Sequence, residues 1–187
     1  MSEELIIRHC SPTLAGLKTG SLFTCDVESE AVLFGKLRQW NRRLLPKGVR
    51  VLPLRYSGNR ALIYAYRPGK LSTDLSDDVA QKLLSSRGYR CENPVQCVAL
   101  LARRVQACAS FPHEIGLFLG YPPEDVAGFI ENRAGGFKCC GYWKVYGDLS
   151  RAKKLFSLYQ KCTDIYCAQW KNGKPVERLT VTTVRTG

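Results

Sequence analysis

Prolines and glycines divide this chain into short segments, and each segment carries its own hydrophobic pattern. Apolar residues at helical spacing over residues 29–45 predict a helix capped by Ser29. The next two segments, residues 49–56 and 61–67, are rich in β-branched and aromatic residues and are joined by a short polar turn. This arrangement predicts an antiparallel hairpin. Pro53 places the first of its strands at a sheet edge, where a missing backbone N–H is tolerated.

The other segments extend the same alternation of helical and strand patterns. The predicted helices are residues 3–10, 76–86, 94–108, 112–119, 123–134, 149–162 and 163–170. The predicted strands are residues 21–25, 137–146 and 179–184. No repeat, low-complexity run or linker interrupts this order. The sequence therefore indicates one α+β domain over residues 1–187, with a small, largely antiparallel sheet packed with several helices.

The net charge restricts the partners of such a domain. The chain has 28 Lys and Arg against 16 Asp and Glu, a formal charge of +12. A positive field of this size attracts an acidic partner or an anionic ligand. No apolar run has the roughly 20 residues that a membrane helix needs, and the acidic start of the chain is unlike a signal peptide. We therefore expect a cytoplasmic protein that does not insert into membranes.

The stretch FPHEIGLFLGYPPEDVAGFIENR, residues 111–133, predicts two helices joined by a stiff corner. Gly120 suits the residue after a helix end, and Pro123 suits the first position of the next helix. This spacing mimics a DNA-binding helix-turn-helix. A recognition helix, however, presents its first residues to the DNA, and here Glu124 and Asp125 would bring carboxylates to a polyanion. The pattern therefore disfavours a DNA-binding regulator, and specific DNA binding is not expected.

His113 and Glu114 stand at the start of the first of these helices, and two interpretations of the pair are open. In one, Glu114 satisfies free backbone N–H groups at the helix start, and His113 is half exposed. In the other, the two side chains share a proton or a metal ion, because histidine titrates near neutral pH and is the commonest metal ligand. His113 and Glu114 are therefore the candidate catalytic residues.

The nine cysteines are an odd number, so they cannot all pair within the chain. A cytoplasmic protein keeps its cysteines as thiols or uses them as metal ligands. Cys139, Cys140, Cys162 and Cys167 are the candidate ligands for Zn or an iron–sulfur cluster. Their spacing fits no established metal-binding pattern. Buried thiols that pack as small apolar side chains are the competing interpretation.

The segment GYWKVYGD alternates, so that Tyr142, Lys144 and Tyr146 share one face of the predicted strand. Two aromatic rings and an ammonium group on one face suit a flat anionic ligand, which would stack on the rings and pair with the charge. The competing interpretation is that these side chains cover a helix and keep only their polar ends in water.

Four blocks of the chain resemble a family known only as a domain of unknown function in clostridial-type anaerobes. The blocks are HCSPTLAGLKTGSLF, GNRALIYAYRP, FPHEIGLFLGYPPEDVAGFIEN and GYWKVYGD. The resemblance implies an iron or redox setting, because such proteins are encoded beside flavodoxins and ferrous-iron transport genes. It therefore points to an acidic redox protein such as a flavodoxin as the partner.

These observations predict a basic binding protein for an acidic partner or anionic ligand in iron or redox metabolism. The alternative is a redox enzyme linked to Zn, Fe or haem that uses His113 and cysteines. An enzyme needs His113 and Glu114 to meet a thiol or a lysine in a pocket, whereas a binding protein needs only the aromatic and basic face.

Overall fold

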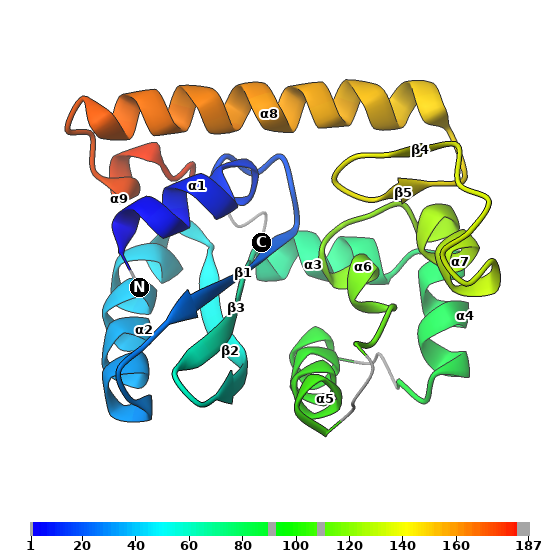
Figure 1. The fold of residues 1–187 in the computed structure, drawn as a ribbon, viewed down its shortest axis with the longest axis horizontal. Coiled ribbons are helices and arrows are strands. Elements are labelled where there is room, and N and C mark those ends of the chain that lie inside the picture. Colours follow the sequence, from blue (N-terminus) through cyan, green and yellow to red (C-terminus); the bar gives the residue numbers. More distant parts are fainter. Residues whose placement is uncertain (1, 90–92, 108–110, 183–187) are drawn as a thin grey trace.

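The main sheet has three antiparallel strands, in the order β1-β3-β2 (Figure 1). The structure is a computed structural model that describes residues 2–89, 93–107 and 111–182. The strands span Gly20–Asp26 (β1), Arg50–Ser57 (β2) and Arg60–Tyr66 (β3). The hairpin of β2 and β3 is confirmed. Pro53 lies on β2 at an edge of the sheet, and the strand register shifts beside it. The predicted edge position is therefore confirmed.

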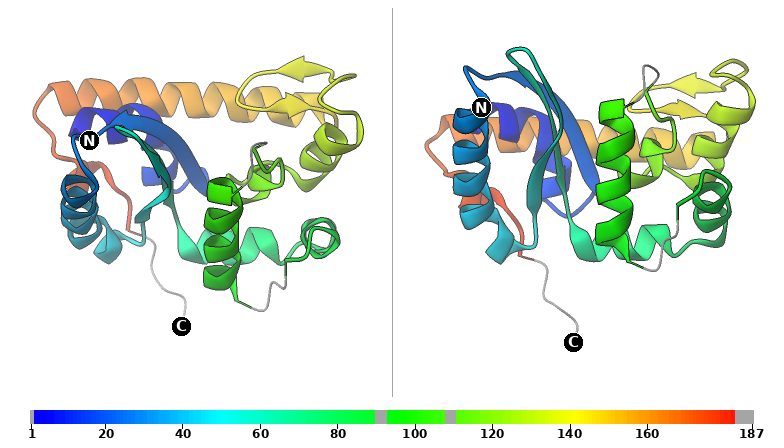
Figure 2. Two further views of the ribbon diagram at one scale, coloured as in Figure 1. Left: turned by 60° about the horizontal axis from the view of Figure 1, so that its bottom comes forward. Right: turned by 90° about the horizontal axis from the view of Figure 1, so that it is seen from below.

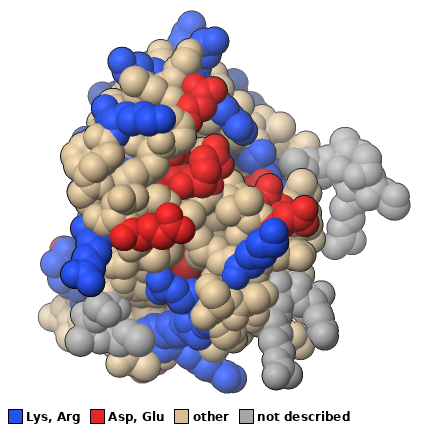
Figure 3. Space-filling view, turned by 90° about the vertical axis from the view of Figure 1, so that its right-hand side faces the viewer, with Lys and Arg blue, Asp and Glu red and all other residues tan. Residues whose placement is uncertain are grey.

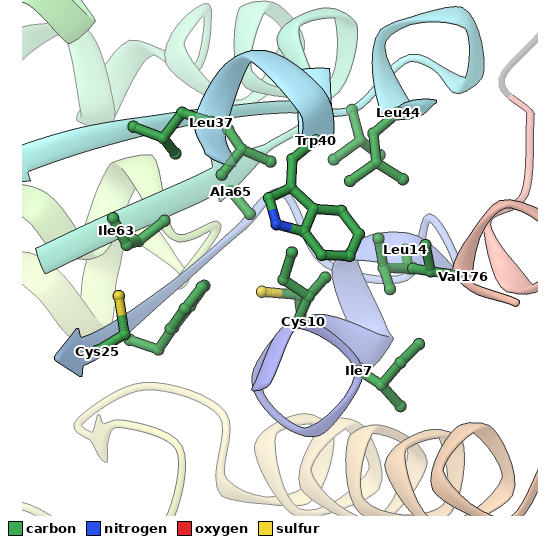
Figure 4. Packing of buried hydrophobic residues seen from close by; sticks show 14 of the residues in the cluster. Ile7, Cys10, Leu14, Cys25, Leu37, Trp40, Leu44, Ile63, Ala65 and Val176 are labelled. Carbon is green, nitrogen blue, oxygen red and sulfur yellow. The ribbon is translucent and has the colours of Figure 1, made fainter. Parts of the chain in front are cut away.

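Helices cover both faces of this sheet (Figure 2). Helices α1 and α2 lie on one face and α3 and α5 on the other, with the bounds Glu3–Leu14, Glu30–Leu44, Pro68–Leu75 and Pro94–Ala107. Successive side chains of β3 serve opposite faces. Ile63 and Ala65 pack with α1 and α2, whereas Tyr64 and Tyr66 pack with the helices of the other face. The side chains between the sheet, α1 and α2 form one hydrophobic core. In Figure 4, Trp40 of α2 reaches across this core toward α1.

The remaining elements lie beside this sheet and complete the α+β class that the sequence predicts. They are η1 (Leu45–Lys47), α4 (Asp78–Ser86), α6 (Ile115–Phe118), α7 (Pro123–Glu131), β4 (Cys139–Cys140), β5 (Lys144–Val145), α8 (Leu149–Lys171) and α9 (Val176–Leu179). Helix α8 runs along one side of the molecule, from the β4–β5 ribbon to α9 (Figure 1). Among the described helices, none combines the length and the apolar character needed to cross a membrane.

In the first half of the chain, the predicted end of one helix is wrong and another helix was missed. Helix α1 does not stop at residue 10 but continues through Pro12 to Leu14. A proline near a helix end removes one N–H without breaking the turns before it. Helix α3 was not predicted at all, because the Arg67-Pro68-Gly69 sequence was interpreted only as the end of the hairpin. Pro68 instead occupies the first position of α3, where its fixed φ angle suits a helix.

Helix α4 and the predicted strand at residues 137–146 also need correction. The cap of α4 is Asp77, whose Oδ1 accepts the N–H groups of Val79 and Ala80, and Ser76 is not the cap. Residues 137–146 form a ribbon of two short strands that turns at Gly141, not one strand. Glycine at position 141 allows the close approach of α8, because a Cβ atom there would clash with the ring of Phe156.

The end of the chain differs from its prediction in two places. Helix α8 passes residue 163 without a break, because the Thr163 hydroxyl donates to the carbonyl of Tyr159 one turn earlier. Leu179 ends helix α9 and does not begin a strand. Residues 183 and 184 of that predicted strand, and Cys108 of the predicted helix over residues 94–108, lie outside the described residues.

Arg67 joins the end of α1 to two other parts of the chain. Its side chain is 1% exposed. Its guanidinium donates to the carbonyls of Thr13 and Leu14 at 2.6 Å, of Val181 at 2.8 Å and of Lys47 at 3.2 Å. The last carbonyls of a helix have no partner within the helix and carry partial negative charge. The buried guanidinium of Arg67 donates hydrogen bonds to these carbonyls and compensates their partial negative charge.

We expect Arg67→Met to lower the free energy of unfolding by about 3 kcal/mol or more. The substitution fills a similar volume but leaves buried carbonyls without donors, and each such loss costs roughly 1–3 kcal/mol. Urea denaturation followed by circular dichroism measures the change. Arg178→Met, at an exposed position, is the matched control and should change the free energy by less than about 0.5 kcal/mol. Equal effects of the two substitutions would contradict the assigned role of Arg67.

Candidate functional site

A hollow of about 320 Å³ lies between the α6–α7 segment and the β4–β5 ribbon. We call it the aromatic pocket, because rings form most of its walls. The rings belong to Phe111, Tyr121, Phe129, Tyr142 and Trp143. The hollow also meets three side chains that can bind or react, His113, Cys140 and Lys144. It therefore brings together residues that lie more than 30 positions apart in the sequence.

The carboxylate of Asp125 holds the ribbon against α7. Asp125 is 3% exposed. Its Oδ2 accepts the indole N–H of Trp143 at 2.6 Å, and its Oδ1 accepts the backbone N–H groups of Tyr146 and Gly147 at 2.7 Å each. Asp125 lies in the first turn of α7, as predicted, but it is buried and does not face a partner as it would in a DNA-binding helix-turn-helix. Asp125 is instead the residue that positions one wall of the aromatic pocket.

Glycines allow the close approach that this arrangement needs. A Cβ atom at Gly128 would lie 2.6 Å from the ring of Tyr146, which leaves no room for a side chain on α7 at this position. A Cβ atom at Gly116, on another wall of the pocket, would lie 2.8 Å from a methyl group of Val126. Both glycines therefore have a packing role that their chain positions did not reveal.

The floor of the pocket is a stack of aromatic rings. The rings of Tyr121 and Trp143 are stacked with centroids 5.0 Å apart, and Phe156 meets Trp143 edge-on at 4.5 Å. Burial raises the pKa of Tyr121 to about 12, so its hydroxyl is neutral at physiological pH. The ammonium of Lys18 lies 5.2 Å from the centroid of the Tyr121 ring. Rings in this arrangement offer flat faces and edges to a ligand and little freedom to move.

The structure separates His113 from Glu114. His113 is exposed, lines the aromatic pocket and meets the ring of Phe129 edge-on at 5.0 Å. Glu114 is 2% exposed. Its carboxylate pairs with Arg104 at 3.2 Å and accepts the hydroxyl of Tyr89 at 3.2 Å. It does not cap α6. Of the two candidates, only His113 can reach a ligand in the pocket.

Tyr142, Lys144 and Tyr146, which were predicted to share one face of a strand, lie in different environments. Tyr142 and Lys144 line the aromatic pocket. The Lys144 ammonium donates to the carbonyl of Ala134 at 2.7 Å and lies 4.5 Å from the ring centroid of Phe137. The Tyr146 ring packs on α7, and its buried hydroxyl has no hydrogen-bond partner among the described residues.

The four candidate cysteine ligands lie in different surroundings. Cys140 is exposed and lines the aromatic pocket, and Cys139 is half-buried beside it on β4. Cys162 is buried in α8, where burial raises the pKa of its thiol to about 11. Cys167 packs beside the core of the sheet. In the described part of the chain, no three His, Cys, Asp or Glu side chains are grouped to hold a metal ion.

The helix-turn-helix pattern also takes a different form in the structure. The first helix, α6, has four residues, and all of them are buried. Glu124 is exposed at the start of α7. Figure 3 shows the end of the molecule that carries α4 and α7, and acidic residues gather at its centre with Lys and Arg around them. The first turn of α7 therefore presents the carboxylate of Glu124, and not a cation, to a partner.

Comparison with known proteins identifies the family of this chain. A family model described as a protein of unknown function (DUF3793) matches residues 6–180. The chain therefore belongs to this family, and the expected membership of a family of unknown function is confirmed. The searches of curated proteins and of solved structures gave no match.

Lys18 provides a test of the packing beneath the pocket. It is 6% exposed, and its ammonium donates to the carbonyl of Gly20 at 2.5 Å. Burial lowers the pKa of this ammonium to about 8, against about 10.4 in an unfolded chain. Between these values the unfolded chain binds a proton that the folded chain has released. Stability should therefore rise with pH in this window.

We expect the unfolding free energy of the wild type, relative to Lys18→Met, to rise by about 1 kcal/mol between pH 7 and pH 9. Methionine keeps the apolar stem of the side chain and removes the charge. Urea denaturation of both proteins at pH 7, 8 and 9 measures the difference. Lys154→Met, at an exposed position, should show no such trend relative to the wild type. A flat difference for Lys18→Met would mean that its ammonium is not buried.

Proposed function

We propose that the protein acts in the cytoplasm as a binding protein for a small, flat, anionic ligand held in the aromatic pocket. The observation that supports this function is the composition of the pocket wall. Aromatic rings from three segments surround it, with the imidazole of His113 and the ammonium of Lys144 beside them. The carboxylate of Asp125 also lines the pocket, but it already accepts three N–H groups. Small-molecule sites are typically apolar hollows with a few placed polar groups.

The size of the pocket limits the ligand. Binding sites for small molecules span roughly 300–1,000 Å³, and about 320 Å³ is at the lower end of this range. A ligand with one or two fused rings suits this volume. Its faces would meet Tyr142 and Phe111, whose side chains are 38% and 39% exposed without a ligand. Covering such rings removes apolar surface from water and stabilises the complex.

The charges around the pocket favour an acidic group on the ligand. The Lys144 ammonium bonds to one carbonyl and has three N–H donors, so it can also bond to an anion. The imidazole of His113 lines the same pocket and can donate a ring N–H to an anion there. The ammonium of Lys18, over the ring of Tyr121, adds positive potential to the pocket. Lys18 is buried, and water screens a buried charge less than an exposed one.

We expect 2-naphthoate to bind at least tenfold more tightly than 2-naphthamide, which has the same shape and no charge. Isothermal titration calorimetry at pH 7 measures both affinities. A change in tryptophan fluorescence that is lost in Trp143→Phe reports occupancy of the pocket, because the chain has three tryptophans. Lys144→Met should remove most of the preference for the anion. Lys138→Met is the matched control, because Lys138 lies on the same ribbon with its ammonium on the carbonyl of Gly147.

Two results would contradict this proposal. One is the absence of binding of either compound at millimolar concentration. The other is an absorption band of haem or of a metal–thiolate centre in protein purified without oxygen, if His113→Ala or Cys140→Ser abolishes it. That result would favour the alternative function of a redox enzyme linked to Zn, Fe or haem. The observation behind this alternative is that His113 and Cys140 border the same hollow.

We also propose, as a second candidate function, that the protein docks an acidic redox protein such as a flavodoxin in iron or redox metabolism. The supporting observation is the outer side of α8. Leu158 and Ile165 are 44% and 48% exposed there. Lys154 and Lys161 lie on the same side of α8, because residues three or four positions apart are neighbours on a helix surface. Apolar side chains between cations match an acidic surface with an apolar centre.

We expect the double substitution Lys154→Glu and Lys161→Glu to weaken binding of a purified flavodoxin at least tenfold at low salt. Calorimetry at 50 mM and 300 mM NaCl measures this, because charge-driven association weakens with salt. The matched control is Arg38→Glu with Arg42→Glu, which makes the same charge change on the exposed side of α2. If both pairs weaken binding equally, overall charge and not the α8 surface attracts the partner.

A further inference from the structure

A second hollow, of about 260 Å³, lies on the other side of the α6–α7 corner. The end of α3, the start of α4, the corner at Pro122 and the start of α8 enclose it. Tyr121 lines both this hollow and the aromatic pocket, so the two share one wall. Aromatic rings line the aromatic pocket, whereas charged side chains of both signs line the second hollow. We call it the charged pocket.

Two carboxylates stand at one side of the charged pocket. Oδ2 of Asp74 accepts the hydroxyl of Thr19, which is itself buried. Oδ1 of Asp77 accepts two N–H groups at the start of α4, at 2.9 Å and 3.0 Å. These bonds fix both side chains. The second oxygen of each carboxylate has no hydrogen-bond partner in the described part of the chain.

One cation stands on α8 and lines the same pocket. Arg151 is exposed in the first turn of that helix, and its backbone N–H bonds to the cap residue Asp148 at 2.9 Å. Its guanidinium has no ion pair or hydrogen bond with any described residue. Arginine and aspartate side chains that can meet usually pair through two hydrogen bonds. Here the opposite charges line one hollow without pairing with each other, and a ligand can bridge them.

We infer that the charged pocket binds a zwitterion of the α-amino acid type. The ammonium of the ligand would bond to the unpaired oxygens of Asp74 and Asp77, and its carboxylate would bond to the guanidinium of Arg151. The aliphatic side chains of Leu117 and Leu155, which also line the pocket, would meet the ligand's own apolar side chain. A ligand with only one charge would leave a charged group of the pocket unpaired, and an unpaired charge is costly once water is displaced.

This inference does not depend on the function proposed for the aromatic pocket. Three probes with the same branched carbon skeleton separate the charge requirements. They are L-leucine, which carries both charges, 3-methylbutylamine, which carries the cation, and 4-methylpentanoate, which carries the anion. We expect L-leucine to bind the full chain at least tenfold more tightly than either of the other two at pH 7, by calorimetry or by ligand-observed NMR.

Arg151→Gln should reduce the affinity for L-leucine to that for 3-methylbutylamine. Lys153→Gln is the matched control, because it removes the same charge from an exposed position of α8 that does not line the pocket, and it should leave the affinity unchanged. Asp74→Asn should also abolish the preference for L-leucine, and circular dichroism establishes whether this variant folds without its bond to Thr19. Arg151 is exposed, so the fold of its variant does not rest on it.

Each other outcome overturns the inference. Equal affinity for L-leucine and the amine would make the hollow a site for cations alone. Equal affinity for L-leucine and the acid would mean that only Arg151 binds. No binding of L-leucine at 10 mM, or an equal loss in the Lys153→Gln control, would show that the pocket is not a zwitterion site. A failure here with intact 2-naphthoate binding leaves the function of the aromatic pocket unaffected.

Discussion

The buried guanidinium of Arg67 is the interaction on which the arrangement of the main sheet and its helices depends. It lies at the end of β3, and it bonds to carbonyls at the end of α1, in η1 and near the end of the described chain. These segments are far apart in sequence, so no local preference brings them together. A planar group with five donors can bond several carbonyls at once, and lysine cannot do this because its donors diverge from one atom.

In the part of the molecule that carries the aromatic pocket, the buried carboxylate of Asp125 joins segments that are distant in sequence, as Arg67 does at the main sheet. The β4–β5 ribbon has only two residues in each strand, and such a ribbon is not stable alone in water. It is held by the bonds from Asp125 and by the packing of Trp143 against Tyr121 and Phe156. The aromatic pocket therefore exists because one buried carboxylate satisfies three donors of the ribbon.

The sequence predicted most helices and the hairpin, because proline, glycine and apolar spacing act locally. It failed where a long-range contact decides the structure. Helix α1 passes Pro12 and is then met by Arg67, and no pattern near residue 12 contains that information. In the same way Asp125 has the ordinary features of a first-turn acid, and its burial depends on the ribbon that follows. The pocket residues His113, Tyr142 and Lys144 were found as residue types, but their common position was not.

Tyr121 separates the two hollows and keeps them separate. Its backbone N–H bonds to the carbonyl of Gly116 at 3.0 Å, its ring stacks on Trp143, and the ammonium of Lys18 lies over that ring. The ring cannot swing aside without losing its contacts with Trp143 and Lys18. The two hollows therefore share a packed wall and do not form one long channel. A ligand in one of them should affect the other through the charge of Lys18 and not by displacing Tyr121.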